Sequence, residues 1–436
     1  MNPFRFERTW LFLPLLIFFV YGPQSVIGFY YLGGSAATYV FAILLIGVLS
    51  YTLTYLVLSN RKIEDSFLLR FRYDLSVNAL TSILHIVSVA YFVLILYIAL
   101  SAEKIALWEA LTGKATRTQI IEAREMFFHN REGLARALPY AFTLFTSVLM
   151  PYFLALGFIN KARLAWPIMI FFMLSLVLSM EKALILKAIF PIFVLAANGY
   201  HKKKFISLSL ILIIATLLGT AYISRGKEER LSSSNTSTPS TSFTVAELNS
   251  PVNVFQGGQE LTLGQHIYKY YPLRGNSFVG ELVNRSLWIP YVTAFDWVQY
   301  FQEKRNSEYL YGTTSTLISK LKGESRFPME STIFQYQFGA YGTKTATANT
   351  NYMIDAFINF GWIGVIFISS FIAVCLIIVK RINNPAASAC MYFFIFQLVG
   401  GGFLGTFLGG GLAFFLVLVY FFRPKFSTDN ALGVRE

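Results

Sequence analysis

The chain has 436 residues, of which 55% are hydrophobic and only 14% are charged, and its mean hydropathy is +0.54. Soluble chains carry about a quarter charged residues, so this composition excludes a soluble enzyme, a disordered scaffold and a disulfide-stapled secreted domain. The formal net charge of +13 would indicate nucleic-acid binding in a soluble protein, but in so apolar a chain it must first be placed relative to a membrane.

Apolar segments dominate the chain and predict an all-α polytopic integral membrane protein with about ten transmembrane helices. A spanning helix needs roughly 20 apolar residues, because the hydrocarbon core is about 30 Å thick. The fifth, sixth, ninth and tenth segments are short, so each of these two pairs can instead contain a broken or re-entrant helix. In chain order the segments are 9–31, 36–59, 78–101, 138–159, 165–180, 183–198, 205–223, 352–379, 386–403 and 407–422.

The loop charges predict the orientation. With the N-terminus inside, the connections on that side are mostly very short, yet they carry 16 of the 36 Lys and Arg residues and only 6 of the 23 Asp and Glu residues. Positive charge in short loops is typical of the cytoplasmic side, so both termini are predicted to be cytoplasmic. A nucleic-acid surface would need one dense basic face, which the sequence lacks.

Three parts follow from these segments. Residues 1–223 are predicted to form a membrane bundle of about seven helices with an amphipathic outer segment, 102–137. Residues 224–351 form a large extracytoplasmic loop, and residues 352–436 form the last membrane helices and a cytoplasmic tail. Connections beyond about 12–15 residues are uncommon and usually functional, so the function is expected on the outer face.

Known metal and phosphate motifs do not appear in the chain. The four histidines show no metal-ligand spacing, and there is no phosphate-binding glycine loop or dinucleotide fingerprint. The glycines Gly401, Gly405 and Gly409 are four residues apart in an apolar hairpin, which predicts close packing of helices through small residues. We therefore expect no metal and no cofactor.

Charged residues within apolar segments are the first candidates for a site. Glu181 and Lys182 lie between the fifth and sixth segments, and Lys187 lies about one helical turn into the sixth, where an unpaired charge costs on the order of several kcal/mol. Two interpretations stay open: the lysines extend to the outer interface, or they bind the anion of a lipid diphosphate. Asp355, shortly after Asn349, is the only acid of the eighth segment, and it either pairs with a lysine or orients a sugar hydroxyl.

Arginines among aromatic residues of the outer segments are the second set of candidates. Arg285 is the most indicative, because an arginine on an otherwise apolar helix needs a partner and its fork of donors suits a diphosphate. The alternative is a salt bridge with Glu281, four residues before it. The full set is Arg124, Arg225, Arg274, Arg285 and Arg326.

Together these features resemble the oligosaccharide repeat-unit polymerases, the Wzy-type O-antigen polymerases of bacterial envelopes. The run 347–365 looks like the stretch where the large periplasmic loop of that family re-enters the membrane. Some members carry Arg-x10-Gly repeats that are absent here, so catalytic residues cannot be transferred from those repeats. The resemblance is carried by residues 120–128, 181–182, 284–290, 309–312 and 347–365.

The resemblance implies a GT-C-like membrane glycosyltransferase in the bacterial inner membrane, with its active site facing the periplasm. It would polymerise undecaprenyl-diphosphate-linked oligosaccharides by transferring the growing glycan en bloc onto a new lipid-linked unit, without a metal. Its further partners would be membrane lipids and possible chain-length regulator and flippase proteins, with no nucleic acid.

This chemistry needs positive groups at the leaving diphosphate and a base for the acceptor hydroxyl. Arg285, Glu281 and Asp355 are expected to be catalytic, and the base is left open between Glu281, Asp296, Glu330, Asp355 and His266. Substrate binding is expected from Arg124, Lys182, Lys187, Arg225, Arg274, Arg326 and Asn349.

Two other functions are compatible with the sequence. The first is an O-antigen ligase of the same fold, which differs from a polymerase in its acceptor. The second is a flippase for lipid-linked oligosaccharides or another transporter. Carriers are commonly built from two similar halves, and no internal repeat is visible here, which favours an enzyme.

Overall fold

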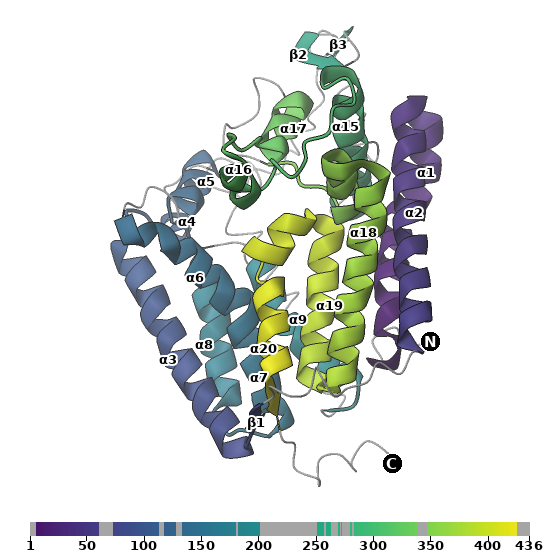
Figure 1. Cartoon of the computed structure of the whole chain (residues 1–436). Helices are drawn as coiled ribbons and strands as arrows, with labels where there is room; N and C mark the ends of the chain where they lie inside the picture. Colours follow the sequence, from purple (N-terminus) through teal and green to yellow (C-terminus); the bar gives the residue numbers. More distant parts are fainter. Residues whose placement is uncertain are drawn as a thin grey trace.

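The structure, a computed structural model, describes residues 6–60, 73–112, 117–127, 133–179, 182–200, 251–256, 259–262, 269–270, 272, 280, 283–338 and 347–424. Within these ranges, a bundle of helices is covered at one end by short helices and a two-stranded hairpin (Figure 1).

Five helices of the described part are long and apolar enough to cross a membrane. Their bounds follow the predicted segments closely, because uninterrupted apolar runs of this length are specific for spanning helices. The prediction of a helical, multi-pass membrane protein is confirmed in this form. The five are α1 (Thr9–Tyr31), α2 (Gly34–Ser59), α3 (Val77–Ser101), the composite helix Ala135–Ile159 and α18 (Tyr352–Ile382).

Shorter helices occupy the remaining predicted spans. The composite helix comprises α6 (Leu138–Leu144), the π-turn η3 (Phe145–Leu149) and α7 (Met150–Ile159). The predicted span 205–223 lies outside the described residues. The shorter helices are α8 (Ala165–Val177), α9 (Lys182–Ala197), α19 (Pro385–Gly400) and α20 (Leu412–Phe421).

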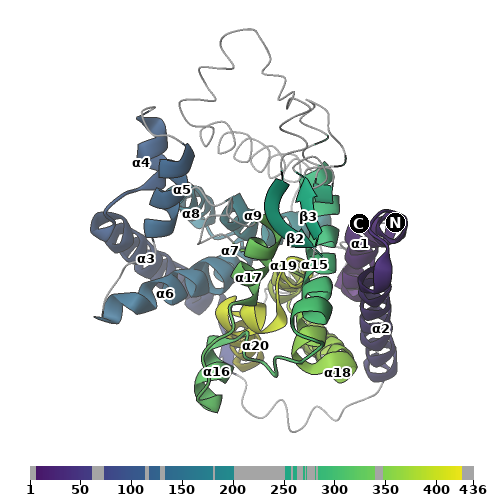
Figure 2. The same ribbon diagram turned by 90° about the horizontal axis from the view of Figure 1, so that it is seen from above.

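The bundle has two flanks. Helices α1 and α2 lie side by side at one edge, and α3 lies at the opposite edge (Figure 1, Figure 2). Helix α18 packs along α2, and α19 occupies the centre, where it contacts α1, α7, α9 and α18. Large aromatic side chains fill this core, including the fully buried rings of Tyr51, Tyr91 and Phe172.

One end of the bundle carries a strand pair that the sequence did not predict. Strand β1 (Tyr73–Leu75) precedes α3, strand β4 (Phe422–Pro424) follows α20, and the two pair in parallel. The short connections between α7 and α8 and between α18 and α19 lie at the same end (Figure 1).

An outer layer covers the other end of the bundle (Figure 1). Helix α15 packs against α1 and α2. Gly28 on α1 is needed for this contact, because a Cβ there would overlap the ring of Tyr291. The layer consists of α4 (Ala106–Leu111), α5 (Arg117–Met126), α15 (Ile289–Lys304), α16 (Thr316–Lys322), α17 (Met329–Phe338) and the antiparallel hairpin of β2 (Pro251–Gln256) and β3 (Gln259–Thr262).

A buried carboxylate holds the outer layer together. Asp296 of α15 is fully buried and accepts hydrogen bonds from Lys269 Nζ at 2.6 Å, Tyr270 Oη at 2.7 Å and Gln337 Nε2 at 2.8 Å. A buried charge needs such partners, because desolvation is otherwise unfavourable. Burial, together with the nearby carboxylates of Asp296 and Glu303, raises the pKa of the Tyr336 hydroxyl well above its ordinary value.

Candidate functional site

A cavity of about 570 Å³ lies where the outer layer meets the bundle. Its size falls within the range of roughly 300–1,000 Å³ that is typical of ligand sites. Three stretches of the sequence, 314–330, 349–355 and 401–409, contribute most of its lining. The lining residues are Tyr140, Trp297, residues 314–317, Lys320, Arg326, Glu330, Asn349, Thr350, Asp355, Gly401, Gly402, residues 404–406, Leu408 and Gly409.

Asp355 is the buried carboxylate of this cavity, with 6% of its surface exposed. It lies in the first turn of α18, which begins where Asn351 caps the helix. The Asn351 Oδ1 atom accepts hydrogen bonds from the backbone N–H groups of Met353 at 3.0 Å and Ile354 at 3.1 Å. Such a cap satisfies donors that the helix leaves unpaired, and an acid in the first turn also interacts favourably with the helix dipole. The local sequence therefore fixes where the carboxylate sits.

Among the described residues, each oxygen of the Asp355 carboxylate has one hydrogen-bond donor. Asn359 Nδ2 donates to Oδ1 at 2.9 Å, and the backbone N–H of Phe403 donates to Oδ2 at 3.0 Å. Gly402 makes the second bond possible, because a Cβ at that position would lie 2.8 Å from Oδ2. An ionised carboxylate accepts about four hydrogen bonds, so about two positions remain for a ligand.

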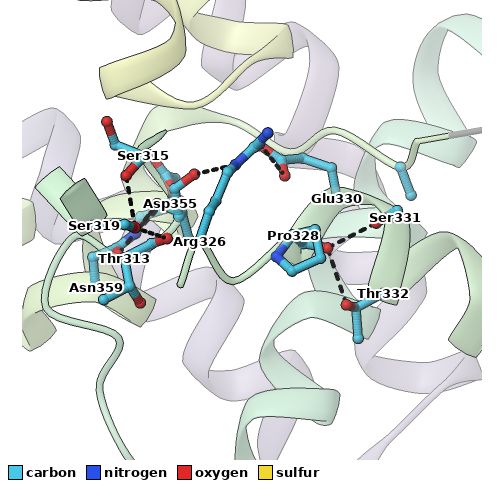
Figure 3. Close-up of polar contacts among 12 residues, drawn as sticks. Thr313, Ser315, Ser319, Arg326, Pro328, Glu330, Ser331, Thr332, Asp355 and Asn359 are labelled. Carbon is cyan, nitrogen blue, oxygen red and sulfur yellow. Dashed lines mark hydrogen bonds and ion pairs between the residues drawn. The ribbon is translucent and has the colours of Figure 1, made fainter. Parts of the chain in front are cut away.

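Asn359 links Asp355 to the loop before α16 (Figure 3). Its Oδ1 accepts from the backbone N–H of Gly312 at 2.9 Å, and its Nδ2 lies 3.2 Å from Thr314 Oγ1. The side chain is almost fully buried. One amide group thus holds both the carboxylate and a lining segment of the cavity.

A break in α18 fixes the position of the loop before α16. At Gly361 the backbone has φ +63°, so the helix continues in a new direction after Phe360. The carbonyl oxygens of Ile358 and Asn359, just before the break, accept from the backbone N–H groups of Leu310 at 3.1 Å and Tyr311 at 2.9 Å. The eighth predicted span is therefore a short helix that carries Asp355, followed by a longer apolar helix.

Two cations lie at the rim of the cavity. Arg326 donates from Nε to the Thr314 carbonyl oxygen at 2.8 Å and from Nη2 to Glu330 Oε2 at 3.1 Å (Figure 3). Its ion pair is partly exposed, with 45% of the Arg326 side chain and 28% of the Glu330 side chain accessible. Such a pair contributes about 0–1 kcal/mol, so a stronger anion can displace the carboxylate. Lys320 of α16 is exposed and forms no ion pair with the residues that the structure describes.

Thr350 adds an unused hydrogen-bonding group. Its side chain is 2% exposed and lines the cavity, and within the described part of the chain its Oγ1 has no hydrogen-bond partner. Buried polar atoms are nearly always paired, so this hydroxyl is available to bind a ligand or a water molecule in the cavity.

Three predicted site residues come together in this cavity: Asp355, Arg326 and Asn349. The carboxylate of Glu330, which the sequence left open as a base, joins them through Arg326. Asp296, another candidate base, lies outside the lining, and its carboxylate is used by the three donors of the outer layer.

Two other predicted residues that the structure describes, Arg285 and Arg124, do not line this cavity. Arg285 is exposed on the π-turn η4 (Asn284–Trp288). Arg124 lies on α5, and its Nε atom is buried without a hydrogen-bond partner among the described residues. The roles predicted for them stay predictions. The side chains of Lys182 and Lys187, and the residues Arg225, Arg274, Glu281 and His266, lie outside the described part.

Sequence reasoning missed several lining or supporting residues. Asn359 was detectable, because it follows Asp355 by four residues and therefore lies on the same helix face. Lys320 and Thr350 carry no local signal. The helix-packing role predicted for Gly405 and Gly409 is wrong: both line the cavity, and an added Cβ at either would meet no atom of the described residues within 4 Å.

Within the described residues, no group of three or more His, Cys, Asp and Glu side chains is placed to hold a metal ion. Comparisons with protein-family models, with curated proteins and with solved structures found no match. The function is therefore inferred from the chemistry of the cavity itself.

Proposed function

We propose that this chain is a membrane glycosyltransferase that polymerises undecaprenyl-diphosphate-linked oligosaccharide repeat units on the periplasmic face of a bacterial inner membrane. The observation that carries the proposal is the cavity between bundle and outer layer. It combines a buried carboxylate, Asp355, with two rim cations, Lys320 and Arg326. A glycosyl transfer from a lipid diphosphate needs this combination of a base and positive charge.

The proposed topology has about ten spans, GT-C-like packing and both termini in the cytoplasm. The connection between α7 and α8, with Lys161 and Arg163, and the last turn of α18, with Lys380 and Arg381, lie at the end of the bundle opposite the outer layer. Short basic loops are typical of the cytoplasmic side, which supports a periplasmic cavity. The division into 1–223, 224–351 and 352–436 belongs to the same proposal.

The proposed reaction joins the growing glycan to a new lipid-linked unit. A hydroxyl oxygen of the new unit bonds to the anomeric carbon of the growing glycan, and the bond between that carbon and the diphosphate oxygen breaks. The diphosphate leaves with the electron pair, and Lys320 and Arg326 stabilise its negative charge. Asp355 accepts the proton of the attacking hydroxyl, which contributes about 10²–10⁴-fold to such reactions.

The test is deletion of the gene, followed by analysis of the lipid-linked glycans that accumulate. A polymerase leaves single repeat units on the outer leaflet, and a plasmid copy of the chain restores the ladder of longer glycans. Lipid-linked polymers that are not passed on would instead identify a ligase. Single units confined to the inner leaflet would identify a flippase. Either of these outcomes overturns the proposal.

A further inference from the structure

The segment between α19 and α20 is rich in glycine and forms one wall of the cavity. Helix α19 ends at Gly400, the π-turn η6 (Gly405–Gly409) follows, and α20 begins after Gly411. The pale yellow ribbon of this C-terminal region lies above the labelled polar side chains in the view of Figure 3. Gly405 and Gly409 both line the cavity.

The structure explains why several positions of this segment are occupied by glycine. A Cβ at Gly402 would meet the Asp355 carboxylate, and a Cβ at Gly410 would lie 2.7 Å from the carbonyl oxygen of Thr406. Gly411 has φ +87°, a conformation that favours glycine. These three positions therefore exclude a side chain for reasons within the protein.

At Gly405 and Gly409, nothing in the described part of the chain excludes a side chain. Neither has a positive φ, and a Cβ at either position would meet nothing within 4 Å among the described atoms. Glycine destabilises a helical turn relative to alanine, so its presence at both positions needs another explanation. Because both line the cavity, the space that they leave open is ligand space.

A second observation indicates which chemical groups the ligand carries. Thr350 lines the same cavity with a buried hydroxyl that has no partner within the described residues, and Asp355 retains acceptor positions. Both groups suit the hydroxyls of a ligand. The glycine wall presents only backbone and Cα–H groups, which suit a flat apolar face. A pyranose ring carries hydroxyls around its edge and C–H groups on its faces, so it matches both features.

We infer that Gly405 and Gly409 form a side-chain-free wall that determines which saccharide the cavity admits, with the C–H face of one sugar ring against the wall and its hydroxyls at Thr350 and Asp355. This inference rests on the proposed function and assigns these two glycines as specificity-determining residues for it. A methyl group at either position occupies the space of the ring without displacing any described protein atom.

The test compares Gly405→Ala, Gly409→Ala and the double variant with Gly400→Ala. Gly400 is a matched control, because its Cβ would also meet nothing within 4 Å of the described atoms, yet it does not line the cavity. In cells that lack the native chain, the double variant is expected to produce at least tenfold fewer multi-unit glycans at a normal protein level. Gly400→Ala is expected to give the wild-type ladder.

A binding measurement separates the wall from the rest of the site. Its probes are single lipid-linked units extracted from the deletion strain and undecaprenyl diphosphate, which has no sugar. The purified double variant is expected to bind the extracted unit at least tenfold more weakly and undecaprenyl diphosphate as tightly as wild type, which also shows that it is folded.

The outcomes distinguish this inference from the proposed function. If polymer formation needs the chain but the double variant gives a wild-type ladder and wild-type binding, the inference about the glycine wall is wrong. The proposed polymerase function is then unaffected. An equal loss of binding for both probes would also overturn the wall, because its contacts are with the sugar. If deletion leaves the ladder intact, the proposed function itself fails.

Discussion

Asn359 and Asp355, one helical turn apart on α18, are joined by a hydrogen bond of 2.9 Å from Asn359 Nδ2 to Asp355 Oδ1. The same amide accepts from the backbone N–H of Gly312 through Oδ1. The position of the carboxylate and the position of the loop before α16 therefore depend on one side chain, and substitutions at both residues test the site.

Replacing Asp355 by Asn is expected to reduce glycan polymerisation by at least ~100-fold, because a neutral amide cannot accept the proton of the attacking hydroxyl. The side chain keeps its size, but its amide nitrogen cannot accept one of the two hydrogen bonds that Asn359 and Phe403 donate to the carboxylate, so activity is compared per folded molecule. The measurement is the rate of polymer formation by the purified enzyme on extracted lipid-linked units. Glu308→Gln, a change of an exposed carboxylate outside the cavity, serves as the control. Wild-type activity of Asp355→Asn would exclude Asp355 as the base.

Replacing Asn359 by Ala is expected to lower the free energy of unfolding by about 1–3 kcal/mol, because buried groups lose their hydrogen-bond partner. Thermal unfolding in detergent measures this loss, and Gln335→Ala on the exposed face of α17 is the control. Activity per folded molecule should fall as well, because Asp355 loses a donor that orients it. If stability falls but activity per folded molecule does not, Asn359 has no positioning role.

Replacing Gly361 by Ala is expected to destabilise the protein by about 1–3 kcal/mol, because φ +63° is strained for any residue with a Cβ. The added Cβ would also lie 2.9 Å from Cζ of Tyr309. Combining it with Tyr309→Ala removes the overlap but leaves the backbone strain, so the double variant should recover only part of the loss after correction for Tyr309→Ala alone. Gly400→Ala should unfold like wild type, and equal stability of Gly361→Ala would contradict the break in α18.

Replacing Lys320 or Arg326 by Ala is expected to weaken binding of undecaprenyl diphosphate by roughly tenfold, in line with the loss of one charge-assisted hydrogen bond of about 1.5 kcal/mol. Lys322→Ala is the matched control, because Lys322 lies on the same helix, pairs with Glu324 and does not line the cavity. Higher salt should reduce the difference between wild type and variants. If all three variants bind undecaprenyl diphosphate as tightly as wild type, Lys320 and Arg326 do not contribute to the binding site.

Replacing Lys269 by Ala is expected to destabilise the outer layer by about 3–5 kcal/mol, because it leaves the fully buried Asp296 carboxylate without its cation. The readout is the thermal unfolding temperature. Glu308→Gln, which removes the charge of the largely exposed partner of Arg305, should change it little. A small effect of Lys269→Ala would mean that Tyr270 and Gln337 alone stabilise the charge.

Apolar runs made most helix bounds predictable, since few other structures tolerate twenty apolar residues in succession. Asp355 was visible for the same reason, as the one acid in its run. The break at Gly361 was not, because the contacts with Leu310 and Tyr311 that favour it come from a distant segment. Arg285 received the most weight from its local pattern, yet the cavity forms from side chains of several elements, and their convergence is a property of the tertiary fold.

The pairing of β1 with β4 has a consequence for biosynthesis. One strand precedes the third helix and the other follows the last helix, so the two edges meet only after nearly the whole chain has been synthesised. Until then strand β1 has no partner strand. Shortened chains that stop before Phe422 are therefore expected to be substrates for membrane quality-control proteases, even though every residue of the cavity is present in them.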